Sequence, residues 1–166
     1  QDTRVVMDVE VVGNIEYWFG CWNTGYRNGA YALGNDGTGG IYCGYGTDGG
    51  TSGAVVAPGR NVVELDKNVA KVNSSPIRTL GTSVFKLSYP LLFAQNRKGS
   101  VYIPGDQGSP ILYSCQIYDN GELVRDFVPA LRNADNVVGL YEQVNGRFYI
   151  PLGGSATAPD AAVTTT

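Results

Sequence analysis

Aromatic residues are dense in one stretch of the chain, between residues 18 and 48, and amide and charged residues lie between them. Sugar rings present apolar C–H faces that stack on aromatic rings, and their hydroxyl groups need planar polar partners such as Asn, Asp and Arg. Tyr, Trp and Arg also dominate protein-binding surfaces. We therefore predict a ligand-binding surface formed by Trp18, Trp22, Asn23, Tyr26, Arg27, Tyr31, Tyr42 and Asp48.

A competing interpretation places half of these aromatic residues in a hydrophobic core. Strand alternation assigns Tyr17, Phe19 and Cys21 to one face and Trp18 and Trp22 to the other. Only one of these sets is core if the opposite face is open, so both interpretations stand at this point.

Residues for catalysis are sparse. The sequence contains no His, which removes Ser-His-Asp and Cys-His arrangements and the usual zinc ligands. Glycoside hydrolases place two carboxylates across the scissile bond, and the nearest candidates are Asp8 and Glu10. No third acid follows at position 12, which is Val. We interpret the two acids as a solvated strand face and predict that the protein is not an enzyme, with glycoside hydrolysis as a minor alternative.

The three cysteines, Cys21, Cys43 and Cys115, are an odd number, so at least one is free or pairs between chains. Cys is commonly a small buried hydrophobe, and this is the interpretation that we favour. A Cys21–Cys43 bridge between neighbouring strands is the alternative.

Charge and hydropathy exclude two classes of partner. The formal net charge is −3, and the 12 Lys and Arg residues are scattered, whereas nucleic-acid binding needs a clustered positive footprint. No apolar run approaches the roughly 20 residues of a membrane span. We predict neither nucleic-acid binding nor membrane insertion.

Short alternating runs separated by turn residues predict an all-β sandwich or barrel. Asp119-Asn120-Gly121 and Asn145-Gly146 are tight hairpin turns. Residues 48–53 are a predicted turn or loop, and residues 96–108 are a predicted loop, with an interrupting strand at residues 101–103 as the alternative. The predicted strands are Thr3–Val12, Ile15–Trp22, Ala30–Leu33, Ile41–Tyr45, Arg60–Leu65, Ala70–Asn73, Ser83–Leu87, Leu91–Ala94, Ile111–Tyr118, Glu122–Val128, Val137–Glu142 and Arg147–Ile150.

The C-terminal third carries a family resemblance. The runs SPILYSCQIYDNGELVRDFVPALR (109–132) and VVGLYEQVNGRFY (137–149) resemble concanavalin A/laminin G-like domains of phage tail proteins and of other surface proteins of gut bacteria. Glu142 stands where that family usually has Asp. TRVVMDVEV (3–11), DKNVAKVN (66–73) and residues 85–96 extend the resemblance upstream, whereas residues 23–53 match no part of it.

The resemblance implies a two-sheet antiparallel jelly-roll sandwich, and carbohydrate binding as a common role. It also makes calcium a candidate, with Asp36, Asp48 and Asp106 as oxygen ligands in Gly-rich segments, although such Asp residues usually form turns. We expect no other cofactor.

Together these features predict a non-catalytic adhesin domain, extracellular or on a virion surface, that binds a glycan or a host cell-surface receptor and forms a homo-oligomer. The alternative is a structural virion, fibre or filament subunit that contacts copies of itself. The sandwich is assigned to residues 1–154. Residues 155–166 form an Ala/Thr/Pro-rich tail, which serves as a linker, a stalk or an arm lying on a neighbouring chain.

Overall fold

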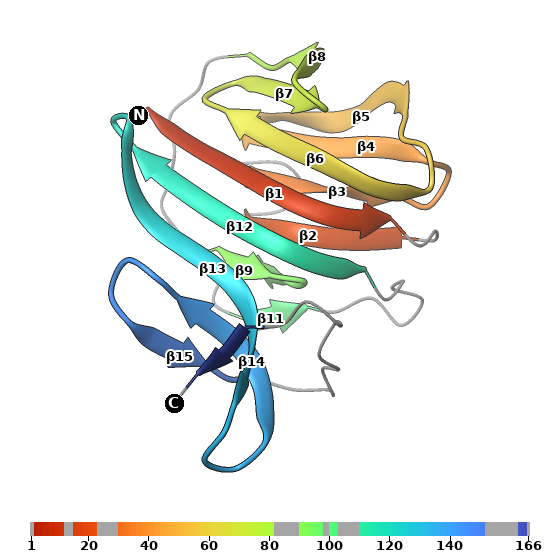
Figure 1. Cartoon of the computed structure of the whole chain (residues 1–166). Coiled ribbons are helices and arrows are strands. Elements are labelled where there is room, and N and C mark those ends of the chain that lie inside the picture. The colour runs from red at the N-terminus through yellow and green to blue at the C-terminus, as the bar shows by residue number, and fades with distance from the viewer. Residues whose placement is uncertain are drawn as a thin grey trace.

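The computed structural model describes residues 2–11, 15–22, 30–81, 90–97, 100–102, 110–151 and 163–165. This described part consists of strands and turns, and it contains no helix able to cross a membrane. The strands form two sheets (Figure 1) that enclose a hydrophobic core. The prediction of an all-β, two-sheet sandwich with mainly antiparallel strands is confirmed.

The larger sheet, sheet A, is built around the N-terminal strand β1. Its order is β15-β14-β13-β12-β1-β6-β7-β8, with β16 beside β13, and β1 pairs antiparallel with both β12 and β6. Its strands are β1 (Thr3–Val11), β6 (Gly59–Asp66), β7 (Val69–Val72), β8 (Ser75–Thr79), β12 (Ile111–Asp119), β13 (Glu122–Arg132), β14 (Val137–Glu142), β15 (Arg147–Tyr149) and β16 (Val163–Thr165).

The second sheet, sheet B, has the order β11-β10-β2-β3-β4-β5, with β9 also beside β2. All its described pairings are antiparallel except the short pairing of β10 with β2. Its strands are β2 (Ile15–Trp22), β3 (Ala30–Asp36), β4 (Gly40–Gly46), β5 (Asp48–Val55), β9 (Leu91–Leu92), β10 (Gln95–Arg97) and β11 (Ser100–Tyr102).

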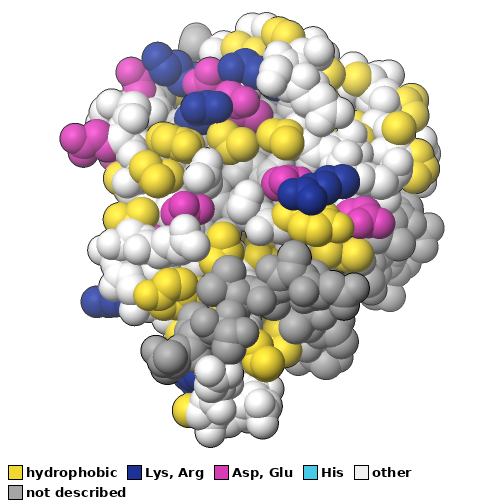
Figure 2. Space-filling model, in the orientation of Figure 1, with side chains coloured by type: hydrophobic (Ala, Val, Ile, Leu, Met, Phe, Trp, Pro, Cys, Tyr) yellow, Lys and Arg dark blue, Asp and Glu magenta, His cyan; other side chains and the backbone are white. Residues whose placement is uncertain are grey.

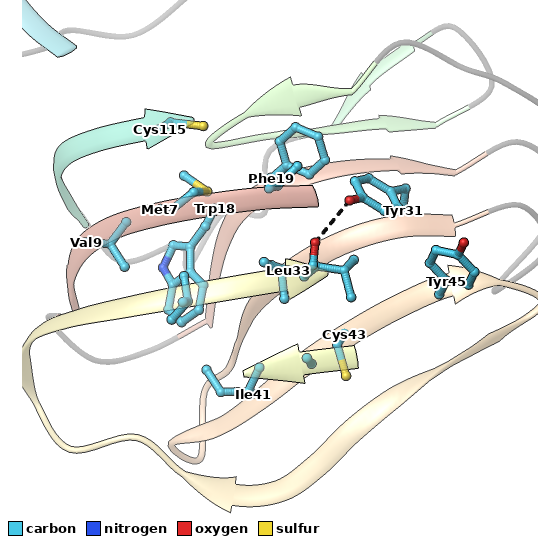
Figure 3. Packing of buried hydrophobic residues seen from close by; sticks show 14 of the residues in the cluster. Met7, Val9, Trp18, Phe19, Tyr31, Leu33, Ile41, Cys43, Tyr45 and Cys115 are labelled. Atoms are coloured by element: carbon cyan, nitrogen blue, oxygen red, sulfur yellow. Dashed lines mark hydrogen bonds between the residues drawn. The ribbon is translucent and has the colours of Figure 1, made fainter. Parts of the chain in front are cut away.

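The core lies between the two sheets (Figure 3). Every second residue of β1, from Val5 to Val11, is buried, and the residues between them face outward, as the alternation predicts. All three cysteines are buried free thiols, so the interpretation of cysteine as a buried hydrophobe is confirmed and Cys21 and Cys43 are not bridged.

The hairpin turns follow the turn chemistry of the sequence. Asn120 and Gly121 both have positive φ, 50° and 84°, as the two-residue turn between β12 and β13 requires. Gly146 has a φ of 66° in the turn between β14 and β15. Both predicted turns are confirmed.

The predicted loop at residues 48–53 is wrong. These residues belong to strand β5, which pairs with β4 even though Gly50 and Gly53 have positive φ values of 154° and 75°. The predicted loop at residues 96–108 begins with the antiparallel pair β10 and β11, and β11 overlaps the alternative strand at residues 101–103. Strand β8 was not predicted, and the predicted strand at 83–87 lies outside the described residues.

The described part of the tail is β16, which pairs in parallel with Ala130–Arg132 of the same chain. The C-terminal half of β13 pairs with β14 on its other edge, whereas the pairing of β13 with β12 stops at Phe127. Strand β16 therefore occupies the edge of β13 that β12 leaves.

Candidate functional site

Trp18, the first residue of the predicted binding surface, is a core residue. Tyr17 pairs with Gly34 and Phe19 with Leu33, so Trp18 is the extra residue of a β-bulge. A bulge interrupts alternation, and Trp18 and Phe19 are both buried, at 0% and 3% exposure. The assignment of these two rings to opposite faces is wrong, and Trp18 offers no ring face to a ligand.

Tyr31 is also buried, and it ties the two sheets together. Its hydroxyl lies 3.2 Å from the carbonyl oxygen of Thr3 and 3.3 Å from that of Leu65, both in sheet A; Figure 3 marks a hydrogen bond of the Tyr31 hydroxyl with a dashed line. Burial raises the pKa of Tyr31 far above its usual range, so the hydroxyl stays protonated and donates hydrogen bonds to these carbonyls. Tyr31 is a core residue that carries one polar contact.

Tyr42 faces away from the core, because its neighbours Ile41 and Cys43 are buried on the inner face. The ring is half-buried. Its hydroxyl lies over Gly49 of the neighbouring strand, where an added Cβ would approach it to 3.0 Å. Of the predicted aromatic residues with described side chains, Tyr42 is the one that keeps a place on an outer face.

Asp48 holds the sheet edges together. Its carboxylate accepts hydrogen bonds from Arg78 Nη2 at 3.1 Å and from the Gly81 amide at 2.7 Å. Arg78 also donates to the carbonyl of Thr51. The Asp48–Arg78 pair therefore fastens β5, the edge of sheet B, to β8, the edge of sheet A.

The remaining predicted ligand residues are not tested. The backbone of Trp22 ends β2, but its side chain is outside the described part. Asn23, Tyr26 and Arg27 lie in a stretch that the structure does not describe, and so does Asp106. These assignments stay predictions.

Asp36 and Asp48 cannot share a calcium ion. Gly40, at the start of β4, lies next to Asp36, whereas Tyr45, five residues further along β4, pairs with Asp48. At about 3.3 Å per residue, the two carboxylates are roughly 16 Å apart.

Asp36 accepts hydrogen bonds from Thr38 and Gly40. Burial acts to raise the pKa of Asp36, but these bonds outweigh burial and lower it. Among the residues that the structure describes, no three acidic or cysteine side chains are grouped as metal ligands. Calcium stays a prediction that would need residues such as Asp106.

A surface that was not predicted from the sequence lies on the outer face of sheet A, over β12, β1 and β6. Figure 2 looks onto this face and shows acidic, basic and hydrophobic side chains interleaved there. Arg60 donates from Nε and Nη2 to both oxygens of Asp8, at 2.9 and 2.7 Å. Its guanidinium lies 3.9 Å from the ring centroid of Tyr113, whose hydroxyl donates to Glu10 at 2.8 Å. We call Asp8, Glu10, Arg60 and Tyr113 the Arg60 cluster.

A second β-bulge brings Tyr113 into this cluster. Ser114 pairs with Asp8 and Leu112 with Val9, so Tyr113 is the extra residue of β12. Regular alternation would place Tyr113 with the buried Cys115, whereas the bulge turns its ring to the outer face. The alternation of the first strand predicts that Asp8 and Glu10 share its outer face, but no sequence pattern identifies Tyr113 or Arg60 as their partners.

The Arg60 cluster is held together by hydrogen bonds to its two carboxylates. Both carboxylates act as acceptors, toward Arg60 and Tyr113, and the hydrogen bonds raise the pKa of both of these partners. The cluster therefore contains a fixed guanidinium, acceptor oxygens and a ring.

The buried thiols are a separate feature. Burial raises the pKa of Cys43 to about 11 and that of Cys115 to about 12, so these thiols are protonated at neutral pH and are poor nucleophiles.

Comparison with known proteins gives no relative from which a role could be transferred: no family model, no curated protein and no solved structure matches the chain.

Proposed function

We propose that this chain is a non-catalytic carbohydrate-binding module that uses the Arg60 cluster on the outer face of sheet A. The jelly-roll arrangement of the concanavalin A/laminin G type, the adhesin role on a phage virion or bacterial surface, and a glycan or host receptor as partner belong to the same proposal. Their support is the C-terminal sequence resemblance together with the two-sheet fold.

The observation that carries the proposal is the long-range assembly of the cluster. Arg60 and Asp8 are 52 residues apart in sequence, and Tyr113 and Glu10 are 103 apart. The side chain of Arg60 is 58% exposed, and exposed ion pairs contribute little to stability. The cluster thus places an exposed guanidinium stacked on a half-buried ring beside two carboxylates, and these apolar and hydrogen-bonding groups are of the kinds that a sugar ring and its hydroxyl groups contact.

The chain contains a matched control for this cluster. Arg132 also donates from Nε and Nη2 to one carboxylate, that of Asp135, and lies 4.9 Å from the ring centroid of Phe148. This group comes from β13, from β15 and from the turn between β13 and β14, and it lacks the hydroxyl–carboxylate contact that Tyr113 and Glu10 supply. Binding through the Arg60 cluster should therefore survive Arg132→Ala.

A glycan array with five proteins tests the proposal: wild type, Arg60→Ala, Tyr113→Ala, Trp22→Ala and Arg132→Ala, each checked for folding by circular dichroism. We expect binding by wild type and Arg132→Ala, and loss of it in Arg60→Ala and Tyr113→Ala. Loss confined to Trp22→Ala would move the site to the stretch after β2. A wild type that binds no glycan contradicts the carbohydrate role.

A second candidate function is a structural subunit that contacts copies of itself. The observation in its favour is the exposure of large apolar side chains beside the β14–β15 hairpin, where Val144 is 46%, Tyr149 42% and Ile150 58% exposed. Light scattering of the chain with and without residues 155–166 tests it. A monomer in both cases removes this candidate.

A further inference from the structure

A second arginine–tyrosine stack lies on the same face as the Arg60 cluster. The guanidinium of Arg4 is 5.1 Å from the ring centroid of Tyr118, and its Nε donates to Glu64 at 2.8 Å. Lys71 bonds to the same oxygen of Glu64 at 3.0 Å and to Asp66 at 2.8 Å. We call Arg4, Glu64, Asp66, Lys71 and Tyr118 the Tyr118 cluster.

Three strands are common to the two clusters, with two roles exchanged, and β7 adds Lys71 to the Tyr118 cluster. In the Arg60 cluster β6 supplies the arginine and β1 the carboxylates, whereas in the Tyr118 cluster β1 supplies the arginine and β6 the carboxylates. Strand β12 supplies the tyrosine in both. Tyr113 and Tyr118 are five residues apart on that strand, which is roughly 16 Å. This separation is too long for one sugar ring to touch both stacks.

Two rows of mostly uncharged side chains lie between the stacks. Gln116, Val6 and Glu64 form one row, and Ser114, Asp8 and Val62 form the next. Val62 is 37% exposed, and Gln116 accepts a hydrogen bond from the hydroxyl of Tyr118. The one carboxylate in each row, Glu64 or Asp8, is already paired with a cation, so apolar and amide side chains connect the two stacks beside neutralised carboxylates.

The charges of the two clusters argue against an anionic ligand. Three cations, Arg4, Arg60 and Lys71, each have a carboxylate partner. Four carboxylates, Asp8, Glu10, Glu64 and Asp66, face them, so the formal balance is −1. An acidic sugar would meet cations that are already paired and a net negative surface.

We propose that the Arg60 and Tyr118 clusters are the two ends of one extended site for a neutral oligosaccharide that lies along β12, β1 and β6. This inference rests on the proposed carbohydrate role and deepens it in two respects. The ligand spans several sugar residues, and it carries no acid groups.

Size-graded oligosaccharides test the inference. Isothermal titration with cello-, malto-, manno- and xylo-oligosaccharides of one to six residues should show affinity rising with length for the series that binds. Oligogalacturonides of the same lengths should bind more weakly than that neutral series. Tyr118→Ala should weaken hexasaccharide binding by about tenfold, the loss expected for one substantial contact, and should leave disaccharide binding unchanged. Tyr113→Ala should weaken both.

Two further variants keep the result interpretable. Arg4→Gln removes the second stack and leaves the Tyr118 ring, so it should reproduce the length-dependent loss even if Tyr118→Ala folds poorly. Tyr149→Ala removes an exposed tyrosine elsewhere on the chain and should bind as wild type.

The inference is overturned if Tyr118→Ala and Arg4→Gln bind the hexasaccharide as wild type does, or if the oligogalacturonides bind best. If Tyr113→Ala then still loses binding, the proposed function survives as a single-cluster site. A wild type that binds none of the probes overturns both.

Discussion

Glu142 is the only acidic side chain in the described part of the molecule that is completely buried, at 0% exposure, and replacing it should destabilise the protein strongly. Its Oε1 accepts hydrogen bonds from the amides of Asp126 and Val144 at 3.1 and 2.9 Å. Its Oε2 accepts two more from the amide and the side chain of Asn145 at 3.0 and 2.7 Å. One carboxylate thus organises the β14–β15 turn and ties it to β13.

The variant Glu142→Gln keeps one acceptor oxygen and turns the other into an amino group. Two hydrogen bonds to a charged acceptor are lost, and the new donor faces other donors. Each such bond contributes about 1.5 to 3 kcal/mol, so we expect the free energy of unfolding to fall by about 3 kcal/mol or more. For a chain of this size that lowers Tm by about 6 °C or more.

The pH dependence gives this prediction a second readout. Burial acts to raise the pKa of Glu142, but the hydrogen bonds outweigh burial and lower it. A carboxylate with a lowered folded pKa contributes full stability above its unfolded pKa of about 4.3 and loses it as pH falls through the folded value. The stability difference between wild type and Glu142→Gln should therefore be constant from pH 7 to 5 and shrink at lower pH.

Urea denaturation at several pH values measures both effects. The matched control is Glu122→Gln, which changes an exposed residue at the start of the same strand β13. If Glu142→Gln unfolds with the same free energy as this control, or if its difference from wild type does not depend on pH below 5, the reasoning fails.

Four other predictions concern the core and the sheet edge. Tyr31→Phe removes the inter-sheet hydrogen bond and should cost about 1 kcal/mol in urea denaturation; no loss would show that the contact is not made in solution. Arg78→Ala releases β5 from β8 and should speed hydrogen exchange of β5 amides, while β1 amides remain protected. Gly50→Ala should loosen the same strand, because its φ is 154° and its new Cβ would lie 3.2 Å from Arg78. Cys43 and Cys115, with pKa values of about 11 and 12, should react with a thiol reagent at pH 8 only after unfolding, and rapid labelling of the native chain would contradict their burial.

Much of the fold could be predicted from the sequence because its signals are local. The alternation of Val5, Met7, Val9 and Val11 fixes the inner face of β1, and Asn120-Gly121 fixes the β12–β13 hairpin. Strand β5 could not be predicted in this way, since its glycines remove the side chains that carry a pattern. Its place depends on long-range contacts, such as the ion pair between Asp48 and Arg78.

The candidate binding surface was harder to predict than the fold because two bulges decide which rings are accessible. A prediction from alternation treats a strand as a strict two-residue repeat. One extra residue therefore makes it assign the residues beyond the bulge to the wrong face. In β2 the extra residue is Trp18, and this predicted ligand-binding ring is buried in the core. In β12 it is Tyr113, and a ring assigned to the side of Cys115 points outward onto Arg60.

Neither bulge disturbs the core, because the residue next to each bulge is buried: Phe19 follows Trp18 in β2, and Leu112 precedes Tyr113 in β12. A bulge that leaves the core intact can place an aromatic ring on a face where the two-residue repeat would not put it. In this chain the ring is Tyr113, beside a guanidinium and two carboxylates that the regular strands β1 and β6 already hold on that face. The irregular residue and the regular ones together make the surface on which the proposed carbohydrate site depends.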